Sequence, residues 1–260
     1  MTQHFDPHSY HIKQSNVVNE DEEPFLTTIV GCTSTYHLRC GPAGNHFSGG
    51  MSPLEKAKFQ FHICRPVNAE LGTDFTAAVN NLETLQNQVG KTKEYKNMIV
   101  EDVTGKMICF TSNVFTTRDE TVPDSPHRQN TQNASKMDEE TRDWPIPDEL
   151  LKEFDILKYK FKAHPFPLYH ENHLVQPVHA NEIINSTMVE VQFHIQHWQI
   201  KDIGSFQATP EKVTILKLGL IRVLSNYKCP IEEEDNAEQL ELKRMHLNDK
   251  ASTSKVVSET

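Results

Sequence analysis

One short stretch of sequence occurs twice, as Gln60-Phe61-His62-Ile63 and as Gln192-Phe193-His194-Ile195. Both copies lie in runs where apolar and polar residues alternate, which is the pattern of a strand with one buried face. A glycine follows twelve positions after each Gln, and a Phe-x-Ala sequence comes next. Because order and spacing agree over about 60 residues, the sequence predicts a duplicated unit.

The alternation assigns the residues of both copies to two faces of a strand. The predicted core faces hold Phe59, Phe61 and Ile63 in the first copy and Val189, Val191, Phe193 and Ile195 in the second. The opposite faces hold Gln60, His62 and Cys64, and Glu190, Gln192, His194, Gln196 and Trp198. Strands buried on one face only are typical of antiparallel sheets and barrels.

Other segments also read as strands. Each copy is preceded by an apolar run, at 25–30 and at 154–161, and residues 100–110 have the pattern of a hairpin. No long helix with caps is predicted. The best candidate helix is 149–162, although Tyr159 and Phe161 are also compatible with a strand.

The sequence therefore predicts a mainly β chain of two similar small antiparallel units in tandem, each a barrel or a sandwich. Five or so strands per unit resemble, in plan only, the oligonucleotide-binding barrel. The predicted parts are an acidic tail (1–24), a first β-rich unit (25–115), an acidic linker (116–145), a second β-rich unit that repeats the first (146–229), and an acidic, polar tail with a possible short helix (230–260).

The net charge of −10 is unevenly distributed along the 260 residues. Segments 1–25, 116–150 and 230–260 carry net charges of −4, −5 and −4, whereas 26–115 and 151–229 carry +1 and +2. The acidic segments contain few apolar residues, so they cannot bury enough surface to offset their ordering entropy. The acidity thus argues only weakly against a polyanionic partner, and no strongly basic patch argues for one.

The sequence disfavours a membrane-spanning or a secreted protein. No run of eighteen apolar residues is present, so we expect no membrane partner, and the N-terminus lacks the pattern of a signal peptide. Five widely spaced cysteines without a C-x-x-C pair are typical of reduced thiols. We therefore expect an intracellular protein, nuclear or cytoplasmic.

Histidines are frequent, and several of them cluster in the second half of the chain. The cluster comprises His164, His170, His173, His179, His194 and His197. The zincin spacing H-E-x-x-H is absent, and Pro165, Pro167 and Pro177 disfavour a long helix there. We expect neutral imidazoles and neither a metal nor another cofactor, with a histidine-dependent metalloenzyme as an alternative.

An enzyme finds no further support in the motifs. The chain has no G-x-S-x-G, no phosphate-binding P-loop and no G-x-G-x-x-G. Its paired carboxylates lie in the predicted linker and tails, where nothing positions them. We therefore favour a non-enzymatic binding protein.

The polar strand faces are the candidate binding surface. Amide, imidazole and indole groups beside bases are typical of a platform on which nucleobases stack. The candidate nucleic-acid-binding residues are Gln60, His62, Arg65, Lys158, Lys160, Gln192, His194, Trp198 and Lys201. Trp198 could equally cap the core or fill an interface between the units.

The preferred hypothesis is thus binding of single-stranded DNA or RNA by tandem β-barrels. The alternative is a bivalent protein-interaction scaffold, whose tails or strand edges would bind protein partners.

Overall fold

The computed structural model describes residues 12–16, 26–89, 94–96, 98–119, 137–200 and 203–219. All of them belong to one compact unit that spans Met1–Val223. The predicted tail 230–260 and most of the predicted tail 1–24 lie outside the described residues.

The described residues form a mainly β structure with one large mixed sheet, in which the pairing of five strands closes into a ring. In spatial order the ring contains β2 (Thr27–Thr33), β3 (Lys58–Cys64), β6 (Gly105–Asn113), β12 (Ile203–Lys217) and β11 (Met188–Ile200). Neighbouring strands are antiparallel except β6 and β12, which are parallel where Phe110 meets Ala208. β11 pairs with both β12 and β2, so the path returns to its first strand.

Shorter strands extend this sheet. They are β1 (Ile12–Asn16) on β11, β4 (Glu94–Lys96) and β9 (Leu168–His170) on β12, β5 (Ile99–Asp102) on β6, and β10 (His173–Leu174) on β9. β5 and β6 form the hairpin predicted at 100–110, with Asp102 opposite Gly105. A separate pair consists of β7 (Phe115–Thr117) and β8 (Phe161–Ala163).

Phenylalanine side chains pack in the core enclosed by the five paired strands. Phe61 and Phe110 stack with their centroids 5.0 Å apart, and Phe110 meets Phe193 edge to face at 5.0 Å. Phe166 packs against Phe61 at 5.3 Å. Both copies of the repeated tetrapeptide are strands with their Phe and Ile residues buried, so the predicted core face is confirmed in each.

The arrangement of two units in tandem is not confirmed. Strands from 25–115 and from 146–229 occupy the same ring: β2 pairs with β11, and β6 pairs with β12. The alternation of a half-buried strand specifies which side faces the core, but not which strand lies beside it. The strands of the two segments therefore share one core.

A long helix, α1 (Ala69–Val89), contradicts the expectation that none is present. The buried side of α1 contains Gly72, Phe75, Val79 and Gln86, at helical spacing. Asn68 caps its start, since the Asn68 Oδ1 accepts a hydrogen bond from the Leu71 N–H at 3.1 Å. The match of Phe75-Thr76-Ala77 to the second copy of the repeat concealed this helix, although Phe75, Val79 and Leu82 recur at helical spacing. The buried Gln86 accepts a hydrogen bond at its Oε1 from the Met98 N–H at 3.0 Å.

The same helix limits the repeat. Phe75-Thr76-Ala77 lies in α1, whereas Phe206-Gln207-Ala208 lies in β12. Similar sequences here adopt different secondary structures, because their tertiary surroundings override local preference. The two copies of the repeat therefore adopt the same secondary structure only at Gln-Phe-His-Ile, in β3 and β11.

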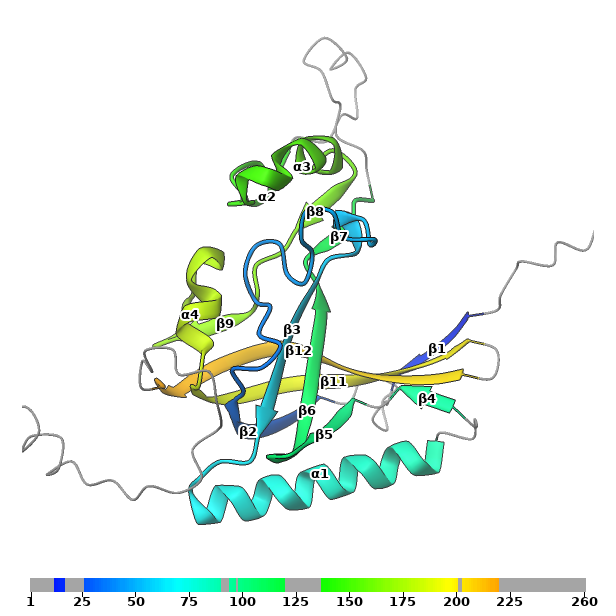
Figure 1. Ribbon diagram of the computed structural model, residues 1–260, viewed down its shortest axis with the longest axis vertical. Helices are drawn as coiled ribbons and strands as arrows, with labels where there is room; N and C mark the ends of the chain where they lie inside the picture. The colour runs from blue at the N-terminus through cyan, green and yellow to red at the C-terminus, as the bar shows by residue number, and fades with distance from the viewer. Residues whose placement is uncertain are drawn as a thin grey trace, which may run out of the picture. The chain divides into compact units, whose positions relative to one another are not determined.

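The predicted strand 154–161 is wrong over most of its length. Its first four residues belong to α3 (Leu151–Leu157), which follows a 3-10 turn, η3 (Asp148–Leu150), and buries Phe154 and Leu157. The other helical segments are α2 (Glu139–Arg142), α4 (Ala180–Ile184), η1 (Leu54–Lys56) and η4 (Pro177–His179). Figure 1 shows α1 at the bottom of the view, near β5 and the lower part of β6. It shows α2 and α3 at the top, near β7 and β8.

The described end of the predicted linker is folded. Asp138 caps α2, Thr141 is fully buried, and the indole N–H of Trp144 donates to the Pro42 carbonyl at 3.0 Å. None of the helices in the described ranges is long and apolar enough to span a membrane.

Candidate functional site

Gln60 and His62 lie on the outer face of β3, opposite its core face, as the alternation predicts, but Gln60 is half-buried and His62 is buried. Gln60 lies opposite Thr111 of β6, and His62 lies opposite Cys109. The Gln60 amide is within 3.9 Å of the Cys109 sulfur. β3 and β6 thus place amide, imidazole, hydroxyl and thiol groups side by side.

An aromatic ladder leads from this face to solvent. The ring of His62 is buried and meets the ring of His37 edge to face at 5.7 Å. The ring of Tyr36 meets His37 at 4.0 Å, also edge to face. His37 is exposed and Tyr36 is 61% exposed, so the ladder ends in two accessible rings.

The His62 ring, at the buried end of the ladder, is uncharged at neutral pH. Burial lowers the pKa of His62, the nearby His37 lowers it further, and Asp102 opposes both effects. The buried Nδ1 of His62 has no hydrogen-bond partner in the described part of the chain. His62 therefore supports the ladder as an uncharged ring.

Residues 34–57, the loop between β2 and β3, are held along β3 by backbone hydrogen bonds. Ser34 N–H donates to His62 O at 2.9 Å, Arg39 and Gln60 form a bridge, and Asn45 N–H donates to Lys58 O at 2.9 Å. Gly44 has a φ of +54°, and a Cβ there would lie 2.5 Å from the Lys58 carbonyl oxygen. Only glycine permits this close approach.

This loop also carries positive charge. Arg39 and Lys56 are exposed, and neither forms an ion pair with another described residue. Such cations are available to an anionic ligand without first breaking a salt bridge. The candidate site therefore consists of the β3 face, the aromatic ladder and these two cations.

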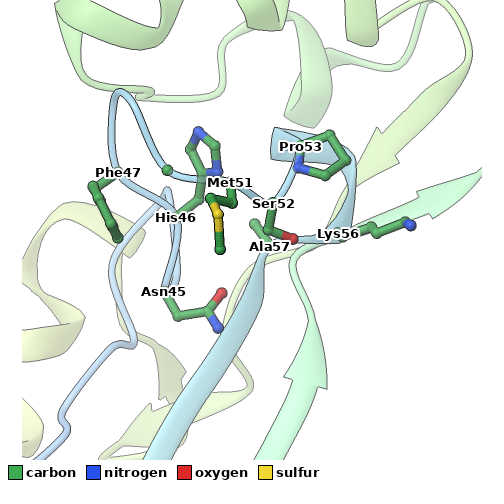
Figure 2. Close-up of a pocket in the computed structure, with 9 residues that line it drawn as sticks. Asn45, His46, Phe47, Met51, Ser52, Pro53, Lys56 and Ala57 are labelled. Carbon is green, nitrogen blue, oxygen red and sulfur yellow. The ribbon is translucent and has the colours of Figure 1, made fainter.

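A small pocket of about 120 Å³ lies in the second half of the loop (Figure 2). It is lined by Asn45, His46, Phe47, Gly50, Met51, Ser52, Pro53, Lys56 and Ala57. Phe47 is 69% exposed and Met51 is fully exposed at the rim.

The other predicted site residues lie elsewhere. Arg65 is exposed after the end of β3, and its Nε donates to the Gly72 carbonyl at 3.2 Å. Lys158 follows α3 and pairs with Asp155 at 2.6 Å, and Lys160 lies in the turn before β8. The predicted strand 154–161, which contains both lysines, is instead the end of a helix, a turn and the first residue of β8.

The predicted residues of β11 do not join the β3 face either. His194 Nδ1 lies 2.8 Å from the Glu211 carboxylate, and Gln192 pairs with Thr28 of β2. Trp198 is half-buried, and its buried indole N–H has no hydrogen-bond partner among residues that the structure describes. It is therefore less accessible than Tyr36. Lys201 lies outside the described residues.

Tyr36, His37, Arg39 and Phe47 were missed by the sequence reading. They lie in a loop without periodicity, and only the fold brings 36–39 beside β3. The bridge between Arg39 and Gln60 has no signal in the sequence.

Two kinds of chemistry are poorly supported by the described residues. Across the described ranges, no three His, Cys, Asp or Glu side chains gather as metal ligands. Burial raises the pKa of Cys109 to about 11 and that of Cys40 still higher, although hydrogen bonds oppose it. Both thiols stay protonated at neutral pH, so neither is an activated nucleophile.

No protein-family model and no curated protein matches this chain. Among solved structures, it is similar to gp2.5, a single-stranded DNA binding protein encoded by bacteriophage T7. The two share 9% sequence identity with a TM-score of 0.40, over 80% of this chain and 100% of that one.

Proposed function

We propose that this chain is a non-enzymatic protein that binds single-stranded nucleic acid through the outer face of β3 and the loop 34–57. The observation that carries the proposal is the aromatic ladder, which ends in the exposed rings of Tyr36 and His37. Arg39, which forms no ion pair with another described residue, follows them in the same loop. Exposed rings stack on nucleobases, and nearby cations follow the phosphate backbone.

The ring of strands supports the same surface. Small Greek-key barrels of the oligonucleotide-binding type bind through the face of their second and third strands and through the loop between their first and second strands. In chain order the ring begins with β2, β3 and β6, so the corresponding elements are the β3–β6 face and the loop 34–57.

Of the residues predicted from sequence, Gln60 and His62 belong to this proposed surface. Gln60 offers its amide to base edges, while His62 holds the ladder in place from its buried position. Arg65, Gln192, His194, Trp198, Lys158, Lys160 and Lys201 stay predictions without a place on this surface.

Fluorescence anisotropy with labelled ten-nucleotide DNA and RNA strands, at two salt concentrations, tests the proposal. We expect binding at low salt that weakens as salt rises, because released counterions drive the association. Tyr36→Ala is expected to weaken binding between about fivefold and a hundredfold, the effect of one lost stacking contact.

Ile156→Ala is the matched control, since Ile156 lies on α3 and is 74% exposed. It should bind as the unaltered protein does. Absence of binding at low salt, or equal effects of both substitutions, overturns the proposal.

A further inference from the structure

The pocket in the loop 34–57 is a formed feature of the fold rather than a gap between mobile turns. Phe47 O accepts from Gly50 N–H at 3.0 Å on one side, and the turn η1 closes the other side. Leu54 and Ala57, each 2% exposed, anchor this part of the loop in the core. These contacts attach the lining of the pocket to the core.

Of two neighbouring lining residues, Asn45 is hydrogen-bonded to β3 and the His46 side chain is buried near α3. Asn45 Oδ1 accepts from Lys58 N–H at 2.9 Å, while its Nδ2 makes no hydrogen bond within the described ranges. The His46 side chain is 5% exposed, and its Nε2, 3.6 Å from the Glu153 carboxylate, has no hydrogen-bond partner there. Figure 2 shows both residues among those that line the pocket.

The volume and the rim of the pocket suit one small ring-shaped group. Its volume of about 120 Å³ is well below the 300–1,000 Å³ of sites for drug-sized ligands. The exposed Phe47 offers a stacking surface, and Met51 a second apolar contact. The lining also offers an amide hydrogen-bond donor at Asn45 and a positive charge at Lys56.

The pocket adjoins the proposed binding face. Asn45 hydrogen-bonds to Lys58, the first residue of β3, and His62 lies four residues further along that strand. Four residues of a strand span about 13 Å, which a nucleic acid strand lying along β3 readily covers.

We propose that this pocket receives one nucleobase of the bound single strand, which stacks on Phe47 while Lys56 contacts a neighbouring phosphate. The inference rests on the proposed function and adds a second, separate stacking position to the one at Tyr36. Asn45 Nδ2 then donates to an acceptor on the base edge.

The test compares two labelled ten-mers of equal charge, oligothymidylate and a fully abasic strand. Phe47→Ala is expected to weaken oligothymidylate binding between about fivefold and a hundredfold, and to leave abasic-strand binding unchanged. Lys56→Gln is expected to weaken both strands alike and to reduce the salt slope by about 0.7 to 1.

Val67→Ala is the control for Phe47→Ala, because Val67 is similarly exposed (72% against 69%) and lies between β3 and α1. Met51→Ala should reproduce the base dependence of Phe47→Ala with a smaller effect.

The outcomes separate the two proposals. If the unaltered protein binds neither ten-mer at low salt, the proposed function fails. If it binds, and Tyr36→Ala weakens binding while Phe47→Ala matches Val67→Ala on both strands, only the base pocket is refuted. An equal loss on both strands by Phe47→Ala also refutes it, since the contact would then not involve a base.

Discussion

Phe61→Ala is expected to lower the free energy of unfolding by about 3–5 kcal/mol, the range for a large aromatic removed from a packed core. Phe61 is completely buried and touches the rings of Phe110 and Phe166. The loss is a large fraction of the 5–15 kcal/mol that typically holds a domain together. Urea unfolding followed by circular dichroism measures it.

Phe61→Leu is the control, because it keeps the site apolar and removes less volume. It should cost clearly less than Phe61→Ala. Equal and small losses for both variants would show that the ring at position 61 is not packed as described.

The same core allows a sharper test of how the two halves are joined. Phe110 and Phe193, from the two segments predicted as separate units, meet edge to face at 5.0 Å. A double-mutant cycle of Phe110→Leu and Phe193→Leu should give a coupling energy of about 0.5–1.5 kcal/mol. Residues of two independent units would instead have additive effects.

The strands were predictable where one physical rule dominates. A strand that buries only one face against a core alternates apolar and polar residues. The buried positions of Phe59, Phe61 and Ile63 therefore follow from the sequence. Pairing between β2 and β11 depends on contacts across more than 150 residues, and alternation carries no information about it. That is why the repeat suggested two cores and the structure has one.

The candidate site was only partly predictable for the same reason. Gln60 and His62 share a strand face, so the period of two brought them together. Tyr36 and Phe47 lie in a loop whose position depends on hydrogen bonds to β3, such as that from Asn45 N–H to Lys58 O. Their exposure, which makes them candidates for stacking, appears only once the loop is placed.

Arg118 and Asp138 connect the residue after β7 with the start of α2. Arg118 donates to Asp138 at 2.5 Å and, through Nε, to the carbonyls of Lys158 and Phe161 at 3.2 and 3.0 Å. Its side chain is only 9% exposed. One ion pair thus joins two described residues that are twenty positions apart in the sequence, and residues 120–136 lie outside the described residues.

Asp138→Ala is expected to lower the free energy of unfolding at pH 7 by about 2–4 kcal/mol. The substitution removes the cap of α2 and leaves the Arg118 charge buried without its partner. Asp138→Asn retains a capping side chain, so it should cost less, about 1–2 kcal/mol given that the carboxylate is a quarter exposed. Urea unfolding at pH 7 compares the two variants with the unaltered protein.

The pH dependence identifies the ion pair as the cause. Partial burial raises the pKa of Asp138, but hydrogen bonds from Thr141 and Arg118 and the charge of Arg118 outweigh it and lower the pKa from 3.8 to about 2. A carboxyl group with a depressed pKa in the folded state stabilises the fold above pH 3.8 and loses that effect as the pH falls towards 2. The difference between the unaltered protein and Asp138→Asn should therefore be constant from pH 7 to 5 and shrink below pH 3.8. A difference that persists unchanged at pH 2 would instead assign the loss to packing, and the link between Arg118 and Asp138 would not be electrostatic.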